Sequence, residues 1–365
     1  YLDTTEQRIS YSDFVNKELI HFSKYDCERS IPNLMDGLKT SLRKILYCAF
    51  KRNLTSEIKV AQFSGYVSEH SGYHHGEASL NGAIVNMAQN YVGSNNINLF
   101  MPNGQFGTRL QGGKDSASER YIFTMLNPIT RKIYLKEDDA IYDYIDDDGQ
   151  IVEPIFYAPI IPMILVNGSK GIGTGFSTDI MCHNPLQIIS YLEAKLNNKN
   201  ILDLKSILIE PYYRGFKGKI YPIDDNRKKY IIKGVYEIIG KDKIKITELP
   251  IGTWTQDYKE FLESLINDNK VSKGKSGSKV KDDYIKDFND MSTDIHVEFE
   301  ITFYPGILST LLNEKYDYGL EGIEKYLKLY TTQSTTNMHL FNAKEQLKKY
   351  ETIYNIIDKS EEHTS

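Results

Sequence analysis

The stretch DGLKTSLRKILYCAFKRN (residues 36–53) sets the character of the first half of the chain. Its apolar side chains recur at the spacing of a helix, which predicts an amphipathic helix with one face in a core. These apolar residues are Leu38, Leu42, Ile45, Leu46 and Ala49. The other face and the end of the helix carry Lys39, Arg43, Lys44, Lys51 and Arg52. We therefore expect a helix that packs on one side and presents positive charge on the other.

Two further helical runs follow, near residues 59–69 and 80–91, and Ser71-Gly72 lies between them. The second run places apolar residues on one stripe, and these are Leu80, Ala83, Ile84, Met87 and Tyr91. A helix, a glycine-containing turn and a second helix beside a basic stretch form the outline of a helix-turn-helix DNA reader. Most such pairs are ordinary helical hairpins, so this outline leaves both interpretations open.

The composition excludes several classes of protein. The 365 residues are 40% hydrophobic and 25% charged, which favours a globular chain over a disordered one. Lys and Arg number 44 against 49 Asp and Glu, a net charge of −5, so no overall basic excess indicates a nucleic-acid partner; segregated charge remains compatible with one. The three cysteines form no CxxC pair, which argues against a disulfide scaffold or a zinc site. No apolar stretch approaches the ~18–20 residues of a membrane span, so we expect no membrane partner.

The rest of the chain predicts a mixture of loops, strands and helices. Glycines replace helical periodicity over residues 95–115, and residues 120–126 have the composition of a strand. Residues 136–150 are acidic and predict a surface loop, and residues 151–180 combine an apolar strand with the glycine-dense string GSKGIGTGF.

After residue 185 the pattern predicts a separate α+β domain. A helix is expected over residues 186–196, and strands near residues 219–223, 230–232 and 243–246. The string NKVSKGKSGSKVK (residues 269–281) predicts an insertion, and residues 338–357 predict a helix.

Three strings resemble ligand sites but depart from them. GKDS at residues 113–116 lacks the earlier glycine and the Ser/Thr of a phosphate-binding loop. GIGTG at residues 171–175 lacks the spacing of a dinucleotide turn, and DDDG at residues 146–149 lacks the first and last carboxylates of a calcium loop. Ordinary turns explain all three.

His74 and His75 precede a predicted helix start at Gly76-Glu77. Neighbouring residues on a helix point about 100° apart, so the two rings would not bind one metal as an i, i+4 pair does. A capping or core role is the default for either ring. Their position also makes the ring N–H groups and the helix N-terminus available to a phosphate.

Five long strings together resemble the DNA-cleavage region of type IIA DNA topoisomerases, in the style of eukaryotes and large DNA viruses. They are RSIPNLMDGLKTSLRKIL (residues 29–46), SGYHHGEASL (71–80), VGSNNINLFMPNGQFGTRLQGGKDSASERYIFT (92–124), EPIFYAPIIPMILVNGSKGIGTGFS (153–177) and ELPIGTWTQDYK (248–259). They span nearly the whole chain in the order of the family.

The resemblance implies a catalytic set around Tyr121. In the family this tyrosine attacks phosphorus and forms a 5′-phosphotyrosyl ester, which stores the energy of the broken strand for resealing. Arg120 resembles the residue that stabilises charge on the phosphate. His74 and His75 resemble the paired histidines beside the cleaved phosphate, with His75 expected nearer to it.

The resemblance also implies a set of DNA contacts. Arg29 and Lys39 match positions that contact DNA near the cleavage site, and Tyr73, Ser79 and Trp254 match positions that contact its backbone. Ile172 matches an isoleucine that the family inserts between base pairs to bend the duplex, whereas in an arbitrary protein it would be a buried loop residue.

The implied fold class is α+β: a winged-helix domain over residues 1–180, a tower domain over residues 181–330 and the start of a coiled-coil arm over residues 331–365. The family holds Mg²⁺ in a TOPRIM domain and ATP in a separate domain, and the sequence contains motifs for neither. We therefore expect a fragment of an ATP-dependent type II topoisomerase, with Mg²⁺ and ATP bound outside it.

The implied partners are double-stranded DNA and a second copy of the chain. The implied location is the nucleus for a cellular enzyme and the cytoplasmic replication site for a viral one. A non-catalytic DNA-bending or scaffolding module with the same fold is the alternative.

Overall fold

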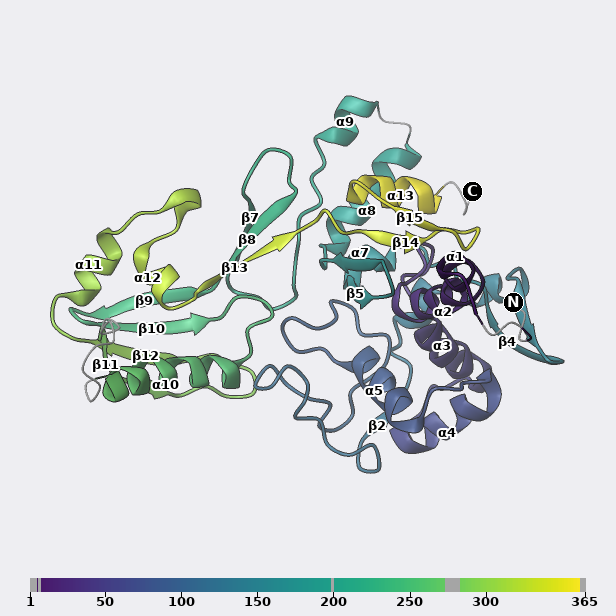
Figure 1. The fold of residues 1–365 in the computed structure, drawn as a ribbon, viewed down its shortest axis with the longest axis horizontal. Coiled ribbons are helices and arrows are strands. Elements are labelled where there is room, and N and C mark those ends of the chain that lie inside the picture. The colour runs from purple at the N-terminus through teal and green to yellow at the C-terminus, as the bar shows by residue number, and fades with distance from the viewer. Residues whose placement is uncertain (1–4, 6–7, 198–199, 273–282, 362–365) are drawn as a thin grey trace.

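The computed structural model describes residue 5 and residues 8–197, 200–272 and 283–361. The chain forms two lobes joined by a small central sheet (Figure 1). The first lobe holds the N-terminal helices, and the yellow C-terminal segment returns to it. The second lobe holds a four-stranded sheet covered by helices. The predicted α+β class is confirmed.

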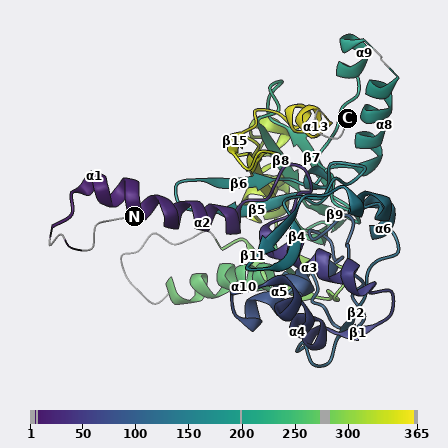
Figure 2. The same cartoon turned by 90° about the vertical axis from the view of Figure 1, so that its right-hand side faces the viewer.

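The first lobe is built on three helices, α3 (Thr40–Arg52), α4 (Val60–Ser71) and α5 (Glu77–Ala88). All three helical predictions are confirmed, with shifted ends. Three residues of the predicted α3 stripe, Ile45, Leu46 and Ala49, are fully buried in the largest core, and Leu42 packs against that core. Before α3, a short α1 (Tyr11–Phe14), a π-helical turn (Val15–Leu19) and α2 (Ile20–Ser30) form an arm that projects from the body (Figure 2).

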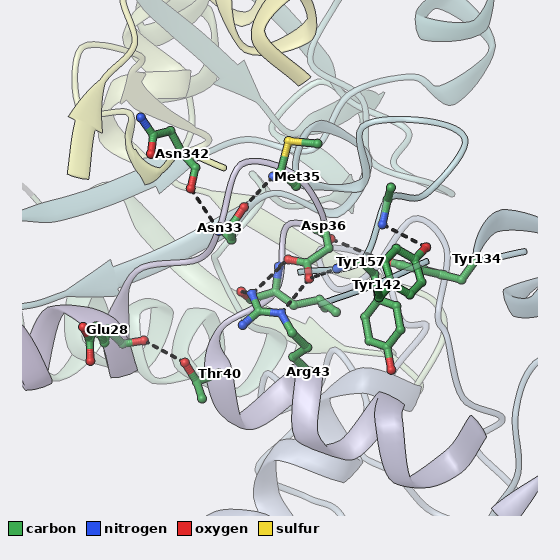
Figure 3. A network of polar contacts seen from close by, with 12 residues as sticks. Glu28, Asn33, Met35, Asp36, Thr40, Arg43, Tyr134, Tyr142, Tyr157 and Asn342 are labelled. Atoms are coloured by element: carbon green, nitrogen blue, oxygen red, sulfur yellow. Dashed lines mark hydrogen bonds and ion pairs between the residues drawn. The ribbon is translucent and has the colours of Figure 1, made fainter. Parts of the chain in front are cut away.

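A buried carboxylate fixes the start of α3 (Figure 3). Asp36 is fully buried and accepts hydrogen bonds from Arg43 Nε at 2.7 Å and from the backbone N–H groups of Leu38 and Tyr157. Gly37 has a φ of +70°, and a Cβ there would lie 2.6 Å from the backbone nitrogen of Ile164. This left-handed turn is why the helix begins at Thr40 and not at Asp36.

The remaining elements of the first lobe are short. They are β1 (Ile58–Lys59) paired with β2 (Phe123–Thr124), α6 (Thr130–Ile133), a 3₁₀ turn (Lys136–Ala140), the hairpin β3 (Tyr144–Asp147) and β4 (Gln150–Pro154), α7 (Met163–Asn167), and the hairpin β5 (Ser169–Ile172) and β6 (Ser177–Ile180). The strand predicted over residues 120–126 shrinks to β2. The loop predicted over residues 136–150 contains β3, and the apolar run near residues 160–166 contributes to α7 instead of a strand.

The second lobe and its connections are antiparallel. α8 (Pro185–Leu196) and α9 (Ile201–Lys205) lead into two sheets, of order β13-β8-β7 and β11-β12-β10-β9. Their strands are β7 (Lys219–Pro222), β8 (Lys229–Lys233), β9 (Val235–Gly240), β10 (Lys243–Glu248), β11 (Ile285–Asp290), β12 (Phe299–Phe303) and β13 (Tyr330–Ser334). The helices are α10 (Thr255–Ser272), α11 (Ile307–Asn313), a 3₁₀ turn (Asp317–Gly319) and α12 (Gly322–Tyr326). α8, β7, β8 and β10 were predicted, whereas β9 and α10 were not.

The insertion predicted over residues 269–281 lies mostly outside the described residues, and α10 extends to its fourth residue. The residues that pack between the four-stranded sheet and its helices form a core of their own, separate from that of the first lobe. The predicted domain limits stay a prediction, and the core of the first lobe also includes α8 and residues 338–357.

The helix predicted over residues 338–357 is wrong for most of its length. Residues 339–349 form the hairpin of β14 (His339–Phe341) and β15 (Leu347–Lys349), and α13 runs only over Ile353–Glu361. The side chain of Asn342 accepts hydrogen bonds from two backbone N–H groups and closes the hairpin turn, and Phe341 donates to Pro32 O at 3.1 Å. Contacts with α8, including Lys195–Asp358 at 2.7 Å, hold α13 against the first lobe.

Candidate nucleic-acid interface

Arg120 and Tyr121 lie in a turn just before β2, at the start of α4. The Tyr121 N–H donates to Ser118 O at 2.9 Å, and the carbonyls of Glu119 and Ile122 accept from the first two residues of α4. Both side chains are exposed, Tyr121 to 75%. The backbone of the turn is therefore fixed, while the phenol and the guanidinium reach solvent.

The glycine-dense segment before this turn is a closed loop. The Ala117 N–H donates to Gln105 O at 2.9 Å, which joins the two ends of the loop. Inside it, the Asp115 carboxylate accepts from the backbone N–H and the hydroxyl of Thr108. Gly107 has a φ of +97°, and a Cβ there would lie 2.6 Å from the backbone of Gly113. The predicted loop is confirmed as an ordered Ω-like loop of residues 105–117.

Trp254 faces this loop. Its half-buried ring packs edge-on against Tyr91, with ring centroids 5.7 Å apart, and a Cβ added to Gly112 would overlap the indole. The ring also lines a cavity of about 500 Å³ between the two lobes. Trp254 therefore contacts the loop before Tyr121, far along the chain from its own position.

His74 and His75 line a cavity of about 250 Å³ at the C-terminal end of α4. Predicted residues Arg29 and Tyr73 line the same cavity. The structure adds Tyr25 and Lys44, which sequence reasoning missed as site residues: the Tyr25 hydroxyl lies 2.9 Å from His75 Nε2, and Lys44 Nζ lies 2.8 Å from Glu153. The position of Lys44 on the basic face of α3 was the only signal for this role. α5 begins at Glu77, as predicted, and its N-cap residue Gly76 makes no side-chain cap.

Burial, and then the positive charges of Arg29, His74 and Lys44, lower the pKa of His75 below its ordinary value of 6.5. His75 is therefore neutral at neutral pH in the folded chain. Because protonation is easier in the unfolded chain, the contribution of His75 to stability is complete above pH 6.5. That contribution declines as the pH falls from there through the lower pKa of the folded state.

We predict that Arg29→Gln raises the pKa of His75 toward 6.5, because the substitution removes one of the charges that oppose protonation. A pH titration of the imidazole resonances by NMR, with His75 assigned through His75→Gln, measures this pKa. Lys24→Gln is the matched control, since Lys24 also lies on α2 and does not contribute to the shift. An equal shift in both variants, or none in Arg29→Gln, would contradict the prediction.

Lys39 and Ile172 meet around the β5–β6 hairpin. Lys39 Nζ donates to Lys170 O at 2.7 Å, and burial lowers the Lys39 pKa. Ile172 is 85% exposed. Its two glycine neighbours pack closely against α2: a Cβ on Gly171 would overlap Ser30 O, and one on Gly173 would lie 2.9 Å from Cys27 Sγ. This tight seat fixes the backbone on both sides of Ile172 and leaves its side chain in solvent.

The structure separates two groups that the sequence analysis placed at one phosphate. The Tyr121 turn contacts the first residues of α4, whereas His74 and His75 follow its last residue. The 12 residues of α4 span about 18 Å at 1.5 Å per residue. Tyr121 and Arg120 do not line the histidine cavity. Ser79 is exposed on the first turn of α5.

Among the described residues, no group of three or more His, Cys, Asp or Glu side chains has an arrangement that would hold a metal ion. The described helices also include none with the length and apolar character of a bilayer-spanning segment.

Comparisons with known proteins give one consistent result. A family model that describes the DNA-cleaving chain of DNA gyrase/topoisomerase IV matches residues 29–365. The chain is 48% identical to DNA topoisomerase 2 of Arabidopsis thaliana over 98% of its own length and 23% of that protein. For DNA topoisomerase 2 of Acanthamoeba polyphaga mimivirus the identity is 44%, over 96% of this chain and 31% of the relative. The chain thus spans about a quarter of the length of such relatives.

A solved structure gives the same answer. The crystal structure of the DNA-binding, cleavage and re-ligation domain of Plasmodium falciparum topoisomerase II matches with a TM-score of 0.86 at 46% sequence identity. The match covers 99% of this chain and 46% of that one.

Proposed function

The chain belongs to the DNA gyrase/topoisomerase IV family, and we propose that it is the DNA-cleavage region of a type II DNA topoisomerase. Such an enzyme opens both strands of one duplex, passes a second duplex through the gap and reseals it. This activity relaxes supercoils and separates linked DNA. The observation that carries the proposal is the exposed phenol of Tyr121 beside the exposed Arg120 on a fixed turn.

In the proposed reaction the Tyr121 oxygen forms a bond to phosphorus while the bond from phosphorus to the 3′ oxygen of the neighbouring nucleotide breaks. The phenol loses its proton and the departing 3′ oxygen gains one. The product is an ester of similar energy to the one it replaces, so the reverse reaction reseals the strand. Arg120 stays protonated and donates to the phosphate oxygens, where negative charge builds up.

We assign the histidine cavity to a phosphate other than the one that Tyr121 of the same chain attacks, because the two groups lie at opposite ends of α4. Arg29 and Lys44 bring positive charge to that cavity, and the ring N–H groups of His74 and His75 can donate to phosphate oxygens. Lys39, Tyr73 and Ser79 are proposed contacts to the DNA backbone. Trp254 is a weaker candidate because its ring packs on the protein.

Ile172 is proposed to bend the duplex. Its exposed side chain is held on a rigid hairpin tip, and an apolar wedge of this kind enters between base pairs at a cost of a few kcal/mol that new contacts on the bent DNA offset.

We predict that Ile172→Ala reduces the bend of a bound duplex while the fold is unchanged, because the shorter side chain no longer separates the base pairs. Energy transfer between dyes at the two ends of the duplex measures the bend. Ile160→Ala is the control, since Ile160 is also exposed and lies outside the hairpin. A bend that persists in Ile172→Ala at saturating protein would show that another group bends the DNA.

Trapping of a covalent adduct tests the proposed function. End-labelled duplex is mixed with the complete enzyme and Mg²⁺, and the mixture is then denatured. A 5′-phosphotyrosyl link that survives denaturation is the expected result. DNA that is bent but never attached would instead support a non-catalytic DNA-bending module.

The complete enzyme is proposed to be a homodimer that makes paired, staggered cuts in double-stranded DNA. Mg²⁺ and ATP are proposed to bind in regions outside this chain. The proposed location is the nucleus in a cell, or the cytoplasmic replication site of a large DNA virus.

A further inference from the structure

We propose that Arg109 and Glu248 are positioning residues for cleavage, because they tie the loop that leads to Tyr121 to the second lobe. This inference rests on the proposed function. It concerns contacts far from the phosphate: the loop of residues 105–117 acts as a bracket, with its tip on the second lobe and its two ends beside the Tyr121 turn.

The tip of the loop is bonded to the second lobe through a buried ion pair. The Arg109 guanidinium donates to both oxygens of Glu248, the last residue of β10, and both side chains are buried. The Glu248 carboxylate also accepts from the backbone N–H groups of Leu249 and Lys217, at 2.9 and 3.2 Å. A buried pair with these additional donors fixes the orientation of the carboxylate.

The loop also supplies hydrogen bonds to the start of α10. The carbonyls of Arg109 and Leu110 accept from the N–H groups of Thr255 and Gln256, which open that helix, at 3.2 and 2.9 Å. Trp254 covers Gly112 on the same side. In Figure 1 this loop, drawn between α5 and β2, extends toward the first turn of α10. Side-chain, backbone and ring contacts therefore all join the loop tip to one edge of the second lobe.

The rigidity of the loop connects this tip to Tyr121. The Thr108–Asp115 bonds brace its middle, the Ala117–Gln105 bond closes its ends, and Ser118 accepts from the Tyr121 N–H. Displacement of a reacting group by about 1 Å can slow a reaction about 100-fold. A loop released from Glu248 is therefore expected to slow cleavage without loss of DNA contacts, since Arg109 and Glu248 are buried and do not face the duplex.

The test uses the complete enzyme with Glu248→Ala, Arg109→Met and the double variant Arg109→Met/Glu248→Met. Glu248→Ala leaves a buried guanidinium without its partner and should lower both stability and the rate of covalent-adduct formation, the latter by up to about 100-fold. The double variant removes both charges, so stability should recover, but cleavage should stay slow at unchanged DNA affinity. Lys233→Met/Glu324→Met is the matched control, because it removes a largely buried pair within the second lobe.

Recovery of the cleavage rate together with stability in the double variant would overturn the inference, as would equal slowing in the control pair. Hydrogen exchange at the Ala117 and Tyr121 amides gives a readout independent of catalysis. Both amides should exchange faster in the double variant, and unchanged exchange would also overturn the inference. Absence of an adduct with the unsubstituted enzyme would instead refute the proposed function, with the exchange result still deciding the role of the pair.

Discussion

Replacement of Tyr121 by phenylalanine is expected to abolish covalent attachment of DNA while DNA affinity stays within about twofold. The substitution removes the only atom that forms the bond to phosphorus and keeps the ring, so the turn retains its packing. Because the side chain is 75% exposed and its N–H bond to Ser118 belongs to the backbone, stability should change by less than about 0.5 kcal/mol. Denaturing gels of labelled duplex measure the adduct, and fluorescence anisotropy measures binding.

Tyr318→Phe is the control for this experiment, since Tyr318 is another exposed tyrosine and lies in the second lobe, away from the turn. It should leave the adduct yield unchanged. An adduct that persists in Tyr121→Phe would place the nucleophile on another residue, and the assignment of Arg120 would fail with it. Lost binding in Tyr121→Phe would mean that the phenol mainly holds DNA.

The helices of the first lobe could be predicted because one apolar stripe on each decides both the helix and its buried face. The segment at residues 338–357 could not. Phe341, Leu347, Tyr350, Tyr354 and Ile357 have a spacing that suits a helix, yet β14 pairs with β15 and exchanges hydrogen bonds with residues 32 and 34. A contact about 300 residues distant along the chain leaves no local periodic pattern, so tertiary pairing overrides local propensity there.

The candidate site shows the same limit. The strings around Tyr121 and His74-His75 identified the residues, but nothing in them indicated that α4 would separate the two groups. Tyr25 has no motif of its own, and its contact with His75 joins two segments 50 residues apart in the sequence. The link from Arg109 to Glu248 spans 139 residues and was missed for the same reason.

Asp36→Ala is expected to destabilise the first lobe by about 3–5 kcal/mol, because it leaves the buried guanidinium of Arg43 without its charge partner. The same substitution leaves the N–H groups of Leu38 and Tyr157 without their acceptor. Such a loss is a large part of the ~5–15 kcal/mol of a typical domain. Native-state hydrogen exchange of the α3 amides measures the free energy of opening in this lobe, separately from the second core.

The effect should reach the proposed DNA contacts, because Lys39 and Lys44 flank the network at the start of α3. Asp139→Ala is the matched control: Asp139 also makes a two-point contact with an arginine, Arg131, but this pair is partly exposed. It should cost less than about 1 kcal/mol, because water screens the pair and solvates the remaining arginine. Equal losses in the two variants would mean that the two-point geometry, and not burial, sets the strength of the Asp36–Arg43 pair.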